Sequence, residues 1–169
     1  MDLPEGLLDV AQHLSRRELR SSDNQAGLRR AVSTAYYALF HLLISDGIEN
    51  WKRVDDRHEL ARMFEHNNMK TACANKRDAL KAESKKAANM GQEGNNSAVN
   101  KHLQIVAETF VEMHQQRESA DYDYATTWTS TDVLATIASV EAAFTAWRAV
   151  RTEDAARAFL FTLLQKKRR

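Results

Sequence analysis

Apolar residues recur at intervals of three and four positions along most of the chain, the spacing of helices that bury one face. The clearest run predicts a helix that polar residues 21–24 can cap and that stops at Asp46-Gly47; its core face is Leu28, Val32, Ala35, Leu39 and Leu42. Similar runs predict helices over about 7–19, 98–118, 133–147 and 154–164. No stretch of useful length alternates apolar and polar residues as a strand would. The sequence therefore predicts an all-α fold, an antiparallel up-and-down bundle of four to five main helices plus a C-terminal helix.

Weaker patterns lie between these runs. Asp56-Arg57-His58-Glu59 resembles a capping box, which predicts a third helix with Leu60, Met63 and Phe64 on its core face. Residues 67–88 favour helix but offer few apolar contacts, so we expect an exposed and bent helical extension. Residues 89–97 hold two of the five glycines among polar residues and are expected to form a mobile loop. Residues 165–169 are expected to form a basic, solvated tail.

Composition narrows the class of protein further. With 169 residues the chain suits a single domain, and five Gly and one Pro fit long helices. Because 24 Lys+Arg balance 23 Asp+Glu, there is no bulk attraction to nucleic acid or anionic lipid, and any phosphate recognition must be local. The single cysteine, Cys73, excludes an intramolecular disulfide. Neither a membrane-spanning apolar run nor a signal peptide is evident, so we expect a cytoplasmic protein without a membrane partner.

One face of the second predicted helix carries chemistry. Arg30, Thr34, Tyr37 and His41 fall within about 60° of one another at 100° per residue. They form either an ordinary solvated face, with Tyr37 half-buried, or a polar cleft. A cation, a hydroxyl, a phenol and an imidazole together suit a phosphodiester ligand.

The fourth predicted helix places an arginine among its core residues. Arg117 continues the stripe Val99, Leu103, Val106, Phe110 and Met113 within about 40° of one direction. Asp121 follows four residues later and can pair with it, and Tyr122 or Tyr124 can close the cluster. The pair is either a structural lock at the end of the bundle or a guanidinium held partly desolvated for a phosphate.

Two segments together resemble the small stand-alone prokaryotic HEPN domains. The first, Arg30-Ala31-Val32-Ser33-Thr34-Ala35-Tyr36-Tyr37-Ala38-Leu39-Phe40-His41, is similar to the A-Y-Y-A-x-F-H helix of that branch. The second, Arg117-Glu118-Ser119-Ala120-Asp121-Tyr122-Asp123, is similar to its R-x-x-A-D-Y motif. The resemblance spans about residues 7–149 and implies a helical bundle that commonly forms a homodimer.

The resemblance also implies metal-independent cleavage of RNA by an R-x4-6-H motif, often in toxin–antitoxin or defence systems. The arginine would stabilise the phosphate charge while the histidine transfers a proton. Arg117 matches the arginine, but Tyr122, Asp123 and Tyr124 stand where the histidine would follow. A tyrosine with an ordinary pKa near 10 is a poor base at neutral pH. The motif alone therefore does not decide whether the chain is an enzyme.

Two other histidines are candidate proton carriers. Residues Arg53 to His58 satisfy R-x4-H literally, but they lie at the start of the third predicted helix and the motif is loose enough to occur by chance. His41 is the second candidate. The catalytic candidates are thus Arg117, Asp121, Tyr122 and His41, and the ligand-binding candidates are Arg30, Thr34, Tyr37, Tyr124 and His58.

Two functions follow as hypotheses. The first is a HEPN-like homodimer that binds RNA or a nucleotide in a cleft and can cleave RNA. The second is a non-catalytic HEPN-like module that partners a nucleotidyltransferase in a toxin–antitoxin pair. Neither needs a cofactor, and the histidines lack the spacing of a metal site.

Overall fold

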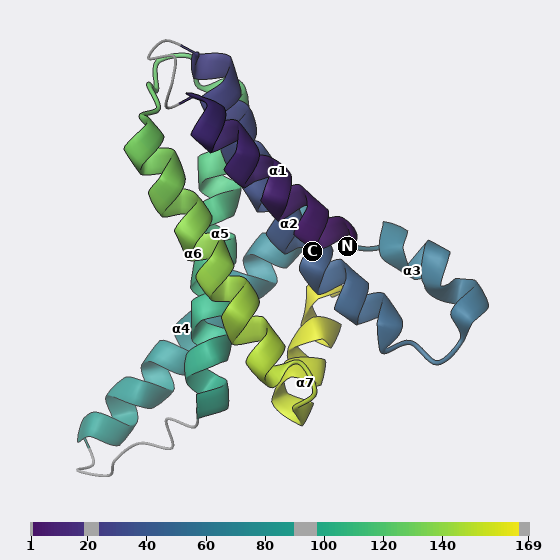
Figure 1. The fold of residues 1–169 in the computed structure, drawn as a ribbon. Helices are drawn as coiled ribbons and strands as arrows, with labels where there is room; N and C mark the ends of the chain where they lie inside the picture. The colour runs from purple at the N-terminus through teal and green to yellow at the C-terminus, as the bar shows by residue number, and fades with distance from the viewer. Residues whose placement is uncertain (1, 19–23, 90–97, 166–169) are drawn as a thin grey trace.

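The computed structural model describes residues 2–18, 24–89 and 98–165, and all its regular elements there are helical (Figure 1). They are α1 (Leu3–Glu18), α2 (Gln25–Glu49), the short 3₁₀ turn η1 (Val54–Asp56), α3 (Arg57–Arg62), α4 (His66–Asn89), α5 (Ala98–Tyr122), α6 (Ser130–Val150) and α7 (Asp154–Leu163). The predicted all-α helical bundle is confirmed. The expected loop at 89–97 and the expected tail at 165–169 fall outside the described residues, except for their first positions.

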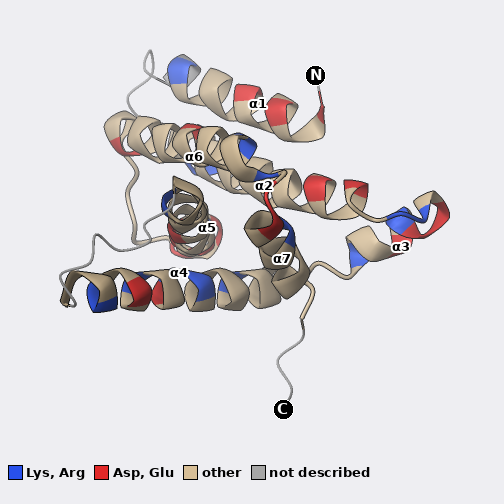
Figure 2. Cartoon of the chain, turned by 90° about the horizontal axis from the view of Figure 1, so that it is seen from below, with Lys and Arg blue, Asp and Glu red and all other residues tan. Residues whose placement is uncertain are grey.

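Helix α2 lies at the centre of the bundle. It packs against α1, α5 and α6, while α4 packs against α5 and α7 (Figure 1). Figure 2 looks almost along the axis of α5 and shows α4 running across one side of it. Large side chains from α2, α5, α6 and α7 fill the space between these helices and are completely or almost completely buried; they include Tyr36, Leu39, Phe110, Trp147 and Phe159.

Three helix starts are fixed by polar side chains that accept otherwise unpaired backbone N–H groups. The Asp2 carboxylate accepts from the backbone of Glu5 at 3.1 Å, and the Asn24 side chain accepts from Gly27 at 3.1 Å. Thr129 and Asp132 form a reciprocal capping box at the start of α6. These short-range contacts explain why α2 begins close to its predicted position.

The predicted stop of α2 at Asp46-Gly47 is wrong, because the helix continues to Glu49. Asp46 is buried and accepts a hydrogen bond from the Trp147 indole, and Arg151 lies 3.4 Å from its carboxylate. Gly47 leaves room for Phe64, since a Cβ added to the glycine would lie 2.7 Å from the tip of that ring. Both residues therefore serve packing within the bundle instead of ending the helix.

The segment after α2 also differs from its prediction. Asp56 does not cap α3 through its side chain; it pairs instead with Arg53 at 3.2 Å, and η1 precedes the helix. Met63 is half-exposed, although Leu60 and Phe64 are buried as predicted. Residues 67–88 belong to one helix, α4, which packs along α5 through Met69, Cys73 and Leu80.

The sequence pattern predicted no segment apolar enough to cross a membrane, but helix α6 meets that criterion. By length and composition alone it is apolar enough to do so. Half of that stretch is buried against the rest of the described chain, and core helices of bundles share this composition. It is weak evidence for a membrane span.

Candidate functional site

Arg29 fixes the end of α5 against α2. Its guanidinium donates to four backbone carbonyls at 2.5–3.3 Å, those of Ser119, Ala120, Asp123 and Thr126. Carbonyls in the last turn of a helix have no partners within the helix, and a cation there is also attracted to the negative end of the helix dipole. Arg29 therefore ends α5 and orders the turn that carries Arg117 and Asp121.

Arg117 lies on the inner side of α5, close to α2. Its guanidinium carbon is 5.3 Å from the centre of the Tyr36 ring, and its side chain is only 11% exposed. One terminal nitrogen lies 3.7 Å from the Asp121 carboxylate, and Nε is buried without a hydrogen-bond partner. The predicted pair with Asp121 is present, but at a distance beyond an ordinary hydrogen bond.

Asp121 is anchored to α2 as well as to Arg117. Its other carboxylate oxygen accepts a short hydrogen bond from the hydroxyl of Ser33. Ser33 is buried, so this contact ties the last turn of α5 to the middle of α2. The carboxylate is therefore held in place beside the arginine.

Tyr36 is completely buried beneath Arg117, and its hydroxyl meets a histidine from another helix. The oxygen lies 2.7 Å from Nδ1 of His66, the first residue of α4. Burial raises the pKa of Tyr36 far above its ordinary value, while the charge of Arg117 acts in the opposite direction. The phenol therefore stays protonated and serves as a hydrogen-bonding partner.

His66 is held by stacking as well as by Tyr36. Its ring lies on that of Phe40, with centroids 4.2 Å apart, and the side chain is partly exposed. Burial lowers the pKa of His66, and the charges of Arg117 and His41 lower it further. His66 is therefore neutral at pH 7, and within the described chain no residue is bonded to its Nε2.

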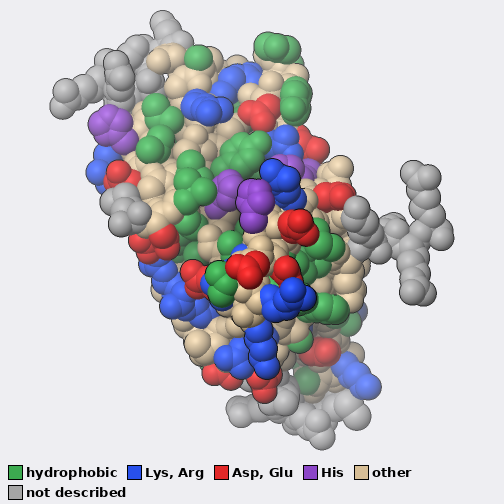
Figure 3. Space-filling model, turned by 90° about the vertical axis from the view of Figure 1, so that its right-hand side faces the viewer, with side chains coloured by type: hydrophobic (Ala, Val, Ile, Leu, Met, Phe, Trp, Pro, Cys, Tyr) green, Lys and Arg blue, Asp and Glu red, His purple; other side chains and the backbone are tan. Residues whose placement is uncertain are grey.

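Tyr37 and His41 extend this cluster along α2. The Tyr37 ring lies 5.8 Å from that of His66 and 6.5 Å from that of His41, and both side chains are half-buried. Burial lowers the pKa of His41. Figure 3 shows histidine side chains reaching the surface close together on one face, beside basic and acidic side chains.

His114 lies below this surface and is completely buried. Its ring meets the edge of Tyr36, with centroids 5.8 Å apart, and neither ring nitrogen makes a hydrogen bond. Nδ1 lies 3.5 Å from Glu118, which Lys70 approaches at 3.8 Å. Burial lowers the pKa of His114, and the charge of Glu118 opposes this shift.

The structure brings together four of the nine predicted site residues: Arg117, Asp121, Tyr37 and His41. Thr34 is buried, and its hydroxyl donates to the carbonyl of Arg30 within the same helix. The Arg30 side chain is exposed. Among the described residues, neither side chain bonds a member of the cluster.

The other three predicted site residues lie outside this cluster. Tyr122, the last residue of α5, and Tyr124 are 72% and 93% exposed. After α5 the chain turns around the Asp123 carboxylate, which accepts from Ala125 and Thr126. His58 is exposed on α3, which packs chiefly against α2 (Figure 1). Tyr36 and His66, and not Tyr122 or Tyr124, complete the cluster around Arg117.

Sequence reasoning missed Tyr36, His66, Ser33 and Arg29. Tyr36 had a signal, since it follows Leu28 and Val32 at intervals of four on the core face of α2. No local sequence pattern pointed to His66, because it lies 30 residues from Tyr36, its hydrogen-bond partner. The packing of α4 against α5, which itself packs against α2, brings it into the cluster around Arg117.

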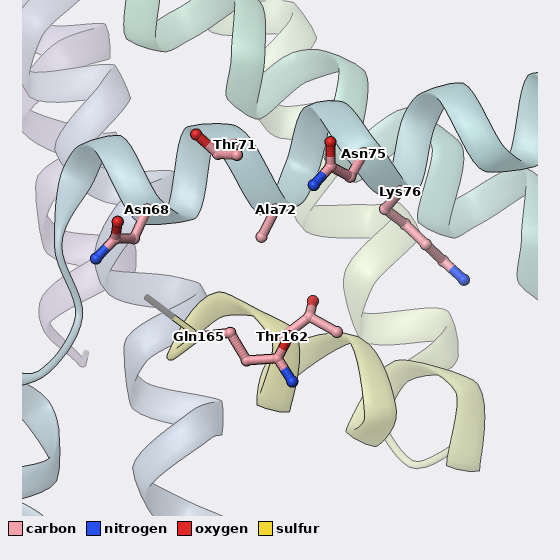
Figure 4. Close-up of a pocket in the computed structure, with 7 residues that line it drawn as sticks. All are labelled: Asn68, Thr71, Ala72, Asn75, Lys76, Thr162 and Gln165. Carbon is pink, nitrogen blue, oxygen red and sulfur yellow. The ribbon is translucent and has the colours of Figure 1, made fainter. Parts of the chain in front are cut away.

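Other cavities lie away from this cluster. An open groove of about 400 Å³ runs between α4 and α7, lined by Asn68, Thr71, Ala72, Asn75, Lys76, Thr162 and Gln165 (Figure 4). Figure 4 shows its polar side chains on both walls, none of them from the Arg117 cluster. Among the residues that the structure describes, no group of three His, Cys, Asp or Glu could hold a metal ion.

Comparisons with protein-family models, curated proteins and solved structures found no match. The structure defines the class of protein as an all-helical bundle with an arginine, histidine and tyrosine cluster between α2, α4 and α5. The resemblance to HEPN domains rests on the two sequence segments alone.

Proposed function

We propose that this protein is a HEPN-like helical bundle that binds RNA through Arg117 and cleaves it without a metal ion. The observation that carries the proposal is that the charge of the nearly buried Arg117 is only weakly paired, because the Asp121 carboxylate lies 3.7 Å from it. A guanidinium has five N–H donors, and leaving such donors unpaired in a dry environment costs free energy. A phosphate that pairs with them removes this cost, and the pairing is strong because both partners are charged.

The comparison with Arg29 sharpens this argument. Both arginines lie at the junction of α2 and α5, but Arg29 bonds four carbonyls at 2.5–3.3 Å. Arg117 has a 3.7 Å contact to Asp121 and an unpartnered Nε. Arg29 is therefore a structural group, whereas Arg117 has only a long contact to a carboxylate among the described residues.

The neighbours of Arg117 suit a single-stranded RNA substrate. Tyr37 is an aromatic ring on which a base can stack. Asp121 orients the guanidinium, and His41 offers a neutral imidazole for hydrogen bonding or proton transfer. We place this activity in a cytoplasmic toxin–antitoxin or defence system, with the protein acting as a homodimer.

The test is binding and cleavage of single-stranded and structured RNA with and without EDTA. We expect cleavage that resists the chelator, and Arg117→Ala should lower it at least 100-fold, the size of effect that loss of one charge-stabilising group has in other enzymes. Binding should weaken, and the slope of log affinity against log salt should fall by about one phosphate contact. Arg157→Ala is the matched control, since Arg157 is an exposed arginine of α7 whose ion pair, among the described residues, is with Asp154.

The same variant separates a structural from a functional arginine. A purely structural Arg117 would, on removal, cost about 3–5 kcal/mol of unfolding free energy and leave Asp121 unpaired. Urea denaturation of Arg117→Ala measures that cost. A stable variant with wild-type RNA binding and cleavage, or a wild-type protein that neither binds nor cleaves RNA, contradicts the proposal.

The proposed homodimer can be tested separately, by measuring the mass of the protein in solution. Light scattering coupled to size-exclusion chromatography should give about twice the chain mass of 19.2 kDa. A monomeric mass at micromolar concentration would contradict the dimer without touching RNA binding.

A second function, the non-catalytic partner of a nucleotidyltransferase, draws on a different surface. Trp51 and Phe161 are 42% and 63% exposed and line one groove of about 140 Å³ where α2, α3 and α7 meet. Exposed aromatic residues beside an apolar groove are typical of protein interfaces. Copurification with a co-expressed nucleotidyltransferase, lost in Phe161→Ser and kept in Arg117→Ala, would support this function.

A further inference from the structure

A proton carrier is the one group that the R-x4-6-H pattern calls for and that the residues after Arg117 do not supply. Tyr122 and Tyr124 occupy that stretch and are 72% and 93% exposed. In the folded chain, however, an imidazole from α4 lies in the cluster around Arg117. His66 bonds Tyr36, and Tyr36 lies directly under Arg117.

We propose that His66 supplies the proton transfer for cleavage, taking the proton from the ribose 2′-hydroxyl on its Nε2. The inference rests on the proposed RNA cleavage and names a catalytic residue that the linear motif does not contain. Tyr36 is its positioning residue, because the hydroxyl at 2.7 Å from Nδ1 fixes the rotation of the ring. Phe40 fixes the plane of the ring by stacking at 4.2 Å.

The chemical step needs no group beyond those present. The step requires the tautomer of His66 that carries its proton on Nδ1, in which Nδ1–H donates to the Tyr36 oxygen and Nε2 has a free lone pair. The 2′-oxygen forms a bond to phosphorus while its proton moves to Nε2, and Arg117 stabilises the charge on the phosphate oxygens. The bond from phosphorus to the 5′-oxygen then breaks, and that oxygen takes the proton back from the imidazolium. The products are a 2′,3′-cyclic phosphate and a 5′-hydroxyl, and His66 returns to its neutral form.

The surroundings of His66 favour the neutral form that this step requires. Titratable and charged groups face His66 from α2 and α5, namely Tyr36, Tyr37 and His41, and His114 and Arg117. Lys70 of its own helix and Glu118 of α5 pair with each other and act on His114. Burial, Arg117 and His41 each lower the pKa of His66. A base of lowered pKa is already deprotonated at neutral pH, so no proton must leave before the reaction.

The experiment is single-turnover cleavage of labelled RNA by the full chain in EDTA, with His66→Gln and His66→Ala as variants. Both should lower the rate about 100- to 10,000-fold while RNA affinity changes less than about threefold. Added imidazole should restore part of the rate of His66→Ala and none of the rate of Arg117→Ala. His13→Gln is the control, because His13 is an exposed histidine of α1.

The pH profile supplies a readout that a structural role would not move. The wild-type rate should rise tenfold per pH unit and level off below pH 6.5, the ordinary value for histidine. The rising limb should vanish in His66→Gln, with circular dichroism verifying that the variant is folded. A substrate with a single 2′-deoxyribose at the scissile position should not be cleaved.

The outcomes distinguish the two proposals. Wild-type cleavage that persists in folded His66→Gln with an unchanged pH profile overturns the role of His66 and leaves the RNA site intact. Absence of imidazole rescue alongside an unchanged profile does the same. A wild-type protein that cleaves no RNA at any pH overturns the proposed cleavage and the role of His66 together.

Discussion

Removal of the Arg29 guanidinium tests how the end of α5 is held. Arg29→Ala would leave four carbonyls of residues 119–126 without their donor. A hydrogen bond to a charged group contributes about 1.5–3 kcal/mol, but the four share one cation and water can replace the donor at the exposed Asp123. We therefore expect the unfolding free energy to fall by about 2–4 kcal/mol.

Urea denaturation followed by circular dichroism measures this change, with an unaltered m-value expected because the same surface unfolds. In a thermal scan the midpoint should fall by roughly 5–15 °C for a domain of this size. Arg29→Lys should recover little, since an ammonium lacks the planar fork that reaches several carbonyls at once.

The neighbouring arginine offers a matched control. The Arg30 side chain is exposed and bonds no described residue, so Arg30→Ala should change stability by less than about 0.5 kcal/mol. Hydrogen exchange should show faster opening of residues 117–126 in the Arg29 variant alone. Equal stability of the two variants, or unchanged exchange in Arg29→Ala, would refute the assignment of Arg29 as the group that ends α5.

Three further predictions concern packing, pH and the site. Gly47→Val should lower the unfolding free energy by about 2 kcal/mol in urea, because its first carbon alone would lie 2.7 Å from the Phe64 ring; unchanged stability would contradict that contact. Burial lowers the pKa of three histidines in the cluster, His41, His66 and His114. At mildly acidic pH the unfolded chain therefore binds protons that the native state does not. Their stabilisation is full above about pH 6.5, and the urea midpoint should fall as pH drops from 7 to 5; a flat midpoint would refute this. Tyr36→Phe should slow RNA cleavage about tenfold with RNA affinity unchanged, measured as for His66, because the ring of His66 loses its hydroxyl partner; an unchanged rate would count against that positioning role.

Sequence periodicity predicted most of the helices, since each depends on residues within a few turns of one another. The Leu28 to Leu42 run and the core stripe of α5 match buried positions in the structure. The inward position of Arg117 and its pairing with Asp121 followed from the same periodicity. These features depend on the geometry of one helix, which the order of residues determines.

Predictions failed where the outcome depended on contacts between helices. Asp46-Gly47 resembles a stop signal, yet Trp147 and Phe64 occupy its surroundings and α2 continues. Tyr122 follows Arg117 closely in sequence, but it is exposed, because five residues along α5 carry it to a different face of the helix. Local propensity differs by about 1 kcal/mol per residue, so a packing contact of similar size overrides it.

By itself the sequence determined that this protein is all-helical, that Arg117 faces inward beside Asp121, and that a net charge of +1 gives no bulk attraction to phosphate. Only the tertiary structure decided which histidine joins that cluster. His66 lies 30 residues from Tyr36 and meets it because α4 packs against α5 while α5 packs against α2. Helices form from interactions between near neighbours in the chain, whereas a site shared by three helices is set by how their buried faces fit together.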